Sequence, residues 1–226
     1  DDTTDIGIGV PGLVRKADDT IVTLPNIPGA GGVALAKRLA ADLSLSVRMD
    51  NDANCFTLAE AVHGAGKGHE VVVGITLGTG VGGGIVLKEA IFRGAHGYAG
   101  EIGHMLVRPG EPPYATEDKR GDVEQFLSGT AMGKRCEAAG KPEDYLEGEV
   151  CSFMRPDIFR EIAWLCTSLT HLIDPSVIVL GGSAGYALRT HLPDIEKEMK
   201  AWMLPDAPLP ALAIAALPDA ATLGAA

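Results

Sequence analysis

The sequence predicts an α/β fold built on a mixed sheet. Short apolar runs typical of strands alternate with longer segments whose apolar residues recur at helical spacing, the pattern of helices packed on a sheet. Two apolar runs within 70–94 are separated by a turn around Gly78-Thr79-Gly80, which predicts a β-hairpin and makes the sheet mixed rather than purely parallel. With 226 residues, 46% of them hydrophobic and 22% charged, the chain is long enough to bury a substantial core.

The first expected elements are two strands and a helix. An apolar run at 5–14 ends in the turn Pro11-Gly12, and the segment 20–32 begins as a strand and continues as a loop rich in proline and glycine. Apolar residues at helical spacing then predict an amphipathic helix over 33–45. These residues are Val33, Leu35, Leu39 and Leu43.

The next elements lead into the hairpin. The apolar run 46–50 predicts a short strand. The segment 53–66 predicts a helix that ends at Gly64 or Gly66, because glycine is favoured just past a helix C-terminus. The hairpin of 70–94 follows directly.

In the second half, the segment 121–140 predicts one helix. The segment 156–174 predicts a long helix that is apolar on nearly all sides and is therefore expected to be buried. The run 175–185 predicts a buried strand that ends on two glycines. The remaining expected elements are an amphipathic helix, a strand and the start of a helix, over 191–203, 209–217 and 218–226.

Composition excludes several function classes. A formal net charge of −11 gives no electrostatic footprint for nucleic acid or anionic lipid, so neither partner is expected. The acidic first residues do not resemble a signal peptide, and no apolar run is long enough to cross a bilayer. The cysteines form no CxxC pair and stand beside no histidine at ligand spacing, so we expect packed thiols in a reducing cytoplasm. They are Cys55, Cys136, Cys151 and Cys166.

A glycine-rich segment at 77–84, LGTGVGGG, packs five glycines and Thr79 into eight residues. Glycine allows a ligand to approach the backbone closely, and successive N–H groups in such a turn bind anions. A tight hairpin with bulges would explain one or two of the glycines. Five favour phosphate binding. The strand ending in Gly181-Gly182 suggests a crevice beyond a strand's carboxyl end, although this motif alone is weak.

The segment GYAGEIGH places Glu101 and His104 three residues apart. A carboxylate and an imidazole can together hold two adjacent hydroxyls of a sugar. Alternatively, Glu101 caps a helix and His104 is a core histidine, and for His104 taken alone the core position is favoured.

The segment RMDNDANCF concentrates polar residues between an expected strand and helix, the geometry that projects a side chain into a cleft. A carboxylate at Asp52 could accept the proton of a hydroxyl that attacks phosphorus. Alternatively, Asp50, Asn51 or Asp52 caps the following helix. Capping needs one polar residue, so the surplus favours a functional role.

Taken together and in this order, these segments resemble the ROK family of sugar kinases and related repressors, in particular glucokinase-type sugar kinases. The resemblance runs across essentially the whole chain. The matching segments are GIGVPGLV, LPNI, DNDAN, GITLGTGVGGGIV, GYAGEIGHMLV, EQFLSGTAM, DPSVIVLGG and the closing LGAA.

The resemblance implies an actin-like ATPase (ribonuclease H-like) fold with two lobes and a cleft. Residues 1–55 would be the remainder of a small N-terminal sugar-binding lobe. Residues 56–226 would form the large C-terminal lobe that carries the nucleotide-binding glycine motifs.

The resemblance also implies an activity: transfer of the γ-phosphoryl of ATP to a hexose hydroxyl, O6 of glucose or a related hexose, with Mg²⁺ offsetting phosphate charge. Asp52 would be the general base. The implied sugar-binding residues are Gly12, Asn26, Asn51, Glu101, His104 and Glu124. Thr79, Gly80 and Gly83 would hold the ATP phosphates, and Gly181 and Gly182 would lie against the adenosine.

The chain departs from the family pattern at two points. Many members carry a CxCGxxGC zinc motif after the glycine-histidine pair, whereas 108–125 contains no cysteine, so no structural zinc is expected. We expect Pro109, Pro112 and Pro113 to limit the freedom of this loop instead. The glycine-rich DxGGT hairpin that opens family kinases is also absent, so the N-terminal lobe is expected to be incomplete and the chain alone a poor or inactive kinase.

Two further functions stay open at this point. The chain could be the sugar-sensing domain of a ROK-type repressor, or a truncated, inactive paralogue. An intact Asp52 and an intact glycine turn favour the kinase. Members of the family are commonly dimers, so the resemblance leaves a homodimer open, and a cytoplasmic location is expected.

Overall fold

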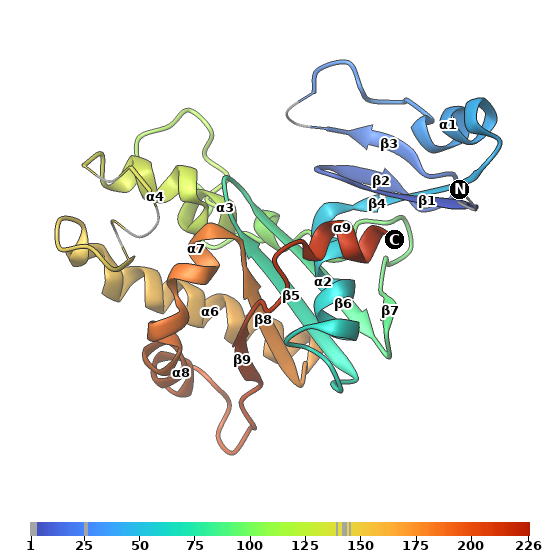
Figure 1. The fold of residues 1–226 in the computed structure, drawn as a ribbon. Helices are drawn as coiled ribbons and strands as arrows, with labels where there is room; N and C mark the ends of the chain where they lie inside the picture. Colours follow the sequence, from blue (N-terminus) through green and yellow to red (C-terminus); the bar gives the residue numbers. More distant parts are fainter. Residues whose placement is uncertain (1–3, 25–26, 139, 142–143, 145) are drawn as a thin grey trace.

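The computed structural model describes residues 4–24, 27–138, 140–141, 144 and 146–226. Figure 1 shows a small N-terminal layer standing over one end of a larger α/β body. Within the described ranges, no helix is both long and apolar enough to span a membrane.

The N-terminal layer contains two short two-stranded sheets and a helix. Strand β1 (Asp5–Val10) pairs in parallel with β4 (Ser46–Asn51), and β2 (Leu13–Arg15) pairs antiparallel with β3 (Thr20–Thr23). Helix α1 (Leu35–Leu43) ends where Ser44 adopts the left-handed conformation. A separate core holds the layer together. Its buried members are Val10, Val14, Ile21, Leu24, Ala36, Val47 and Met49.

Helix α2 (Asp52–His63) follows β4 without a loop and ends at Gly64, as the sequence predicts. It is buried on most sides because it packs under the N-terminal layer, against the large sheet and against the closing helix α9 (Ala220–Ala225). The fit to α9 is close: a Cβ on Gly224 would overlap the Cys55 carbonyl.

The large sheet has the order β7-β6-β5-β8-β9. Strands β5 and β6 form the predicted antiparallel hairpin, and β8 and β9 run parallel to β5, so the sheet is mixed as expected. The strand bounds are β5 Val71–Leu77, β6 Val81–Leu87, β7 Ala90–Ile91, β8 Val177–Gly181 and β9 Ala211–Ile214.

Helices cover both faces of this sheet, because alternate strand residues point to opposite sides. Val72 and Val177 face α2, whereas Val73 and Ile178 belong to the main core beneath α6 (Arg155–Ile173) and α8 (Leu192–Lys200). The short elements that connect these layers are η1 Ile102–His104, η2 Ser152–Met154, α7 Gly182–Ala187 and η3 Arg189–His191.

Two helix predictions need correction. The helix expected over 121–140 is divided into α3 (Val123–Leu127) and α4 (Gly129–Arg135), because Ser128 is extended between them and its hydroxyl caps α4 by accepting from the Ala131 N–H. Helix α6 is buried around most of its circumference between Ile158 and Thr170, as predicted, but its last turn is not, and Leu172 there is 73% exposed.

The expectation of four packed thiols was wrong. Cys136, at the end of α4, forms a disulfide with Cys151, just before η2. The Cα atoms of the pair lie 6.2 Å apart. Cys55 and Cys166 are free and buried, as expected for packed thiols. The spacing of the cysteines along the chain did not reveal this pairing. Because two of the four cysteines form a disulfide, the cysteine pattern no longer supports a reducing compartment.

Candidate active site

The polar residues between β4 and α2 each have a different hydrogen-bonding role. Asp50 accepts from Arg93 Nε at 2.7 Å and from the side-chain amide of Asn54 at 2.8 Å. Asn51 is the helix cap: its oxygen accepts from the Ala53 and Asn54 N–H groups. The Asn51 amide also donates to the Gly12 carbonyl at 3.0 Å, which joins two of the expected sugar-binding residues.

Asp52 lies where two cavities meet, and Asp52 and Thr76 line both. Burial raises the pKa of the Asp52 carboxyl above its ordinary value of 3.8, and the Ala53 backbone N–H partly opposes this. We name the first cavity, of about 340 Å³, the glycine-turn cavity, and the second, of about 350 Å³, the α9 cavity.

The glycine-turn cavity brings together several of the expected site residues. Its further lining comes from Pro11, Gly12, Asn51, Gly78, Thr79, Gly80, Val81, Gly82, Glu101 and Glu124. They come from the β1–β2 turn, the end of β4, the β5–β6 turn with the start of β6, the residue before η1, and α3. The fold therefore gathers, around Asp52, residues from distant parts of the sequence.

Glu124 fastens the glycine turn. Its Oε2 accepts from the Val81 N–H at 2.9 Å, and a Cβ on Gly80 would lie only 2.5 Å from that oxygen. A side chain at position 80 would therefore displace the Glu124 carboxylate from the Val81 N–H. The turn's carbonyls are also held: Gly78 accepts from the Gly129 N–H at 2.7 Å, and Thr79 accepts from the Thr130 hydroxyl at 2.8 Å.

Glu101 precedes η1 and His104 is its last residue, and neither takes the alternative role considered from the sequence. Glu101 makes no side-chain capping bond to η1 and lines the glycine-turn cavity. Burial raises the pKa of the Glu101 carboxyl. The charge of His104 lowers this pKa in part, and the charges of Asp52 and Glu124 raise it further.

The His104 side chain is 51% exposed, so it is no core histidine. It lines a neighbouring cavity of about 490 Å³ that shares Thr79, Gly80 and Glu124 with the glycine-turn cavity. We call this neighbour the His104 cavity. His104 thus approaches the glycine turn from a different side than Glu101.

The remaining expected site residues fall in three places. Gly182 has a φ of +78° and lines the α9 cavity with Tyr186. Gly181 and Gly83 pack closely, because a Cβ would lie 2.5 Å from Phe56 at position 181 and 2.5 Å from Ile102 at position 83, and neither glycine lines the glycine-turn cavity or the α9 cavity. Asn26 lies outside the described residues.

Sequence reasoning missed Arg93 and Thr76. Arg93 is a lone arginine after the hairpin, and its partner Asp50 stands 43 residues earlier, so no local pattern marks the pair. Thr76 could have been found, because it lies two residues before the glycine turn on a strand that points into it.

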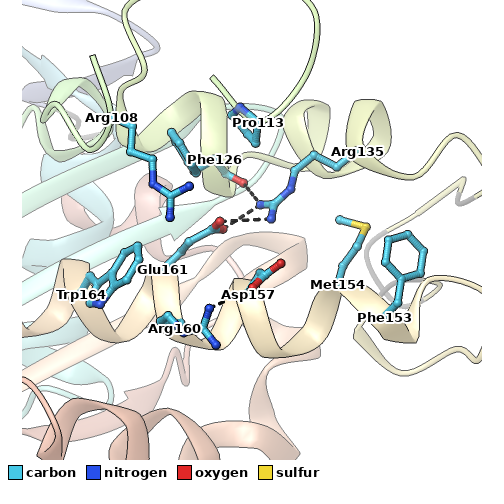
Figure 2. Close-up of a pocket in the computed structure, with 10 residues that line it drawn as sticks. All are labelled: Arg108, Pro113, Phe126, Arg135, Phe153, Met154, Asp157, Arg160, Glu161 and Trp164. Atoms are coloured by element: carbon cyan, nitrogen blue, oxygen red, sulfur yellow. Dashed lines mark hydrogen bonds and ion pairs between the residues drawn. The ribbon is translucent and has the colours of Figure 1, made fainter. Parts of the chain in front are cut away.

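The loop between η1 and α3 is fastened without cysteines. Val107 and Arg108 both donate their backbone N–H to the Gly121 carbonyl at 2.9 Å. Figure 2 shows the Arg108 guanidinium reaching over α6, and it lies 5.8 Å from the centre of the Phe126 ring and 5.5 Å from that of Trp164.

The same view shows a buried ion pair beside Arg108 (Figure 2). Arg135 donates two hydrogen bonds to the Glu161 carboxylate, at 2.7 and 3.1 Å, and both side chains are less than 10% exposed. The cavity here measures about 300 Å³ and is also lined by Pro113 of the loop. Among the described residues, no group of three or more His, Cys, Asp or Glu side chains is arranged to hold a metal ion.

Comparisons with known proteins agree with this arrangement. A family model described as "ROK family" matches residues 1–226. The N-acetyl-D-glucosamine kinase of Vibrio atlanticus is 35% identical over 196 residues, which are 78% of this chain and 64% of that protein. The chain therefore spans just under two thirds of the length of such curated relatives.

Solved structures give the same picture. The ROK hexokinase from Thermus thermophilus aligns with a TM-score of 0.83 and 29% identity, over 97% of this chain and 76% of that one. A ROK glucokinase from Streptomyces griseus, in complex with glucose and AMPPNP, aligns with a TM-score of 0.78 and 31% identity. The alignment covers 100% of this chain and 81% of that one. These likenesses confirm the expected actin-like ATPase fold.

A ROK family transcriptional regulator, a homologue of the E. coli MLC protein, is also similar. It aligns with a TM-score of 0.84 and 25% identity, over 98% of this chain and 61% of that one. The fold is thus shared by catalytic and regulatory proteins.

Proposed function

The chain belongs to the ROK family, and from that premise we propose that it carries the site of an ATP-dependent sugar kinase. The observation that carries the proposal is the position of Asp52, which lines both the glycine-turn cavity and the α9 cavity. A base at this junction can reach a sugar hydroxyl on one side and the transferred phosphoryl group on the other.

The glycine-turn cavity and the adjoining His104 cavity, which share Thr79, Gly80 and Glu124, are proposed to hold the sugar together. Glu101 and Glu124 offer carboxylate oxygens to hydroxyl donors, and Gly12 and Asn51 close the cavity from the N-terminal layer. The names of the relatives support a hexose of the glucose or N-acetylglucosamine type, and we propose O6 as the hydroxyl that accepts the phosphoryl group. We propose that residues 1–55 and 56–226 are the two lobes that enclose it.

ATP is proposed to bind along the glycine turn and toward Gly182. The turn's carbonyls are held by α4, which leaves the Thr79 and Gly80 N–H groups as donors for phosphate oxygens. Gly182 lines the α9 cavity at the end of β8, the edge of the sheet where nucleotides bind in such folds. Mg²⁺ would arrive bound to the phosphates of ATP and offset their charge.

In the proposed reaction, the Asp52 carboxylate removes the proton of the attacking hydroxyl. The sugar oxygen forms a bond to the γ-phosphorus while the bond from that phosphorus to the bridging oxygen of ADP breaks. Burial strengthens Asp52 as a base, because it raises the pKa of the carboxyl.

A second candidate function is supported by the likeness to the transcriptional regulator. In that case the same cavity would bind a sugar without phosphorylating it. Such a sensing domain needs Glu101 and Asn51 but has no use for a base at position 52.

The deciding experiment measures ADP release and sugar binding on the same samples. The purified chain, Asp52→Asn and the control Asp42→Asn, which alters an exposed carboxylate on α1, are assayed with ATP, Mg²⁺ and a panel of hexoses. Calorimetry reports sugar affinity. Turnover that falls at least 100-fold in Asp52→Asn, with affinity kept, supports the kinase. Binding without ADP release by the unaltered chain, the result expected if turnover needs the absent DxGGT hairpin, contradicts kinase activity of this chain and favours the sensor, and no binding of any sugar overturns both.

A further inference from the structure

Asp122 is a fully buried carboxylate held from three directions. It caps α3, where its Oδ1 accepts from the Gln125 N–H at 3.1 Å. Its Oδ2 lies 3.3 Å from His104 Nδ1 and 3.4 Å from Arg120 Nη1. Both oxygens thus face hydrogen-bond donors, which fixes the orientation of the carboxylate.

The backbone around Asp122 is fixed as well. The Gln125 side chain accepts from the Gly121 N–H at 2.7 Å and donates to the Asp118 carbonyl at 3.0 Å. Asp122 also pairs with Leu106 in an isolated β-bridge, so the two ends of the loop from η1 to α3 are joined at this point. Asp122 therefore cannot swing away from His104 without opening the base of that loop.

This contact decides which nitrogen of His104 carries the proton. A carboxylate only accepts hydrogen bonds, so the nitrogen that faces it, Nδ1, must be the donor. In the neutral ring Nε2 then carries the lone pair. The two ring nitrogens point away from each other, so Nε2 faces away from buried Asp122, and the half-exposed His104 side chain lines the His104 cavity.

We propose that Asp122 is a positioning residue that presents Nε2 of His104 as a hydrogen-bond acceptor. The ligand must then offer a donor to this nitrogen, a hydroxyl or an amide N–H. A ligand group that can only accept, such as fluorine or an ether oxygen, would be rejected there. This inference rests on the proposed function, because it treats the ligand as a sugar.

The first test reads the histidine tautomer and needs no activity. The chain has six histidines, and the His104 signals are assigned in ¹⁵N–¹H correlation spectra of ¹⁵N-histidine-labelled protein by their loss in His104→Gln. We expect the proton on Nδ1. In Asp122→Asn, whose amide can donate to Nδ1 and still cap α3, we expect it on Nε2. A proton on Nε2 in the unaltered chain, or an unchanged tautomer in Asp122→Asn, overturns the proposal.

Asp118→Asn is the matched control. This change removes a carboxylate that pairs with the same arginine, Arg120, in the same loop. The side-chain bonds of Asp118 are to Arg120 and not to His104, so the His104 proton is expected to stay on Nδ1. Asp122→Ser, which keeps a capping oxygen, serves as a second variant if Asp122→Asn does not fold. In Asp122→Ser the His104 proton is expected to lose its preference for Nδ1.

The second test compares sugars in which one hydroxyl at a time is replaced by hydrogen or fluorine. We expect one position on the sugar at which the fluoro and deoxy analogues are equally poor substrates. Relative to the parent sugar, both should have a KM raised at least tenfold and a kcat changed much less. Asp122→Asn should reduce the increase in KM that the fluoro sugar shows over the hydroxyl sugar at this position. Asp118→Asn should leave that increase in KM unchanged. An equal reduction in both variants contradicts the proposal. Absence of turnover with every sugar would contradict the proposed function, while the tautomer measurement would still decide the role of Asp122.

Discussion

Asp50 of β4 receives both Nε and Nη2 of Arg93, at 2.7 and 2.6 Å, and so ties the N-terminal layer to the loop after β7. The Asp50 side chain is only 14% exposed. The same carboxylate accepts from the Asn51 N–H and the Asn54 amide. The turn that presents Asp52 is therefore held from the large sheet.

Removal of Arg93 should destabilise the protein. Arg93→Ala leaves the Asp50 carboxylate without its charged donors, and we expect a loss of about 1.5–3 kcal/mol in the free energy of unfolding. Urea denaturation measures it. Arg15→Ala, which breaks an exposed pair with Asp18, is the control and should cost less than about 1 kcal/mol. Equal losses would show that Arg93 is no more than a surface charge.

Asp52→Asn should separate activity from stability. Loss of a general base lowers kcat by about 10²–10⁴-fold. The pKa of this carboxyl is raised above 3.8 in the folded protein, so its contribution to stability is full below 3.8 and is lost as pH rises through the folded-state pKa. The variant should therefore melt at a higher temperature than the parent at pH 7, and the difference should vanish below pH 3.8. A lower melting temperature at pH 7 would contradict this.

The pH dependence of kcat/KM should have an acidic limb above pH 3.8. Activity requires the ionised Asp52, so it falls as pH drops through the raised pKa of that group. A pH–rate profile measures the position of the limb. A limb at or below 3.8 would rule out Asp52 as the titrating base.

Glu60 should act as a buried anchor for the segment before α9. Its carboxylate accepts from the backbone N–H groups of Ala65, Ala216 and Leu217 at 2.8–3.1 Å. Glu60→Ala leaves these three N–H groups without an acceptor, and we expect a loss of about 2–5 kcal/mol in the free energy of unfolding. Glu70→Ala, at an exposed position, is the control. Similar unfolding curves for the two variants would contradict the anchoring role.

Two glycine-to-alanine changes should have opposite signs. At Gly224 a Cβ would overlap the Cys55 carbonyl, so Gly224→Ala should separate α9 from α2 and lower the melting temperature. At Gly133, within α4, a Cβ would point into space that no other described segment fills within 4 Å, so Gly133→Ala should stabilise by about 0.5–1 kcal/mol. Thermal melts test the pair, and a destabilising Gly133→Ala would contradict the packing described for α4.

Arg108→Lys should loosen the loop from η1 to α3. Lysine keeps the charge but loses the planar group that stacks on Phe126 and Trp164. We expect faster amide hydrogen exchange over 105–122 and a higher KM for sugar, with kcat changed less. Lys119→Ala, an exposed change in the same loop, is the control. Unchanged exchange in Arg108→Lys would show that the stacking does not hold the loop.

The local features of this protein could be predicted from its amino-acid sequence. The strand, polar turn and helix around Asp52, the glycine-rich hairpin and the mixed sheet all follow from periodicity and turn chemistry within short windows. The family pattern added the expectation that these windows meet at one cleft. The glycine-turn cavity does gather Gly12, Asn51, Asp52, Glu101 and Glu124.

The pairing of side chains, in contrast, depends on the tertiary structure. The Arg93–Asp50 bond, the Asp122–His104 contact and the Cys136–Cys151 disulfide each join residues far apart in the chain. The break at Ser128 is of the same kind, because helical spacing continues through it while Gly129 is bonded to the glycine turn. Local patterns measure propensity over a few residues, whereas partners are set by how the sheet and its helices pack, and that packing fixes the chemistry of the site.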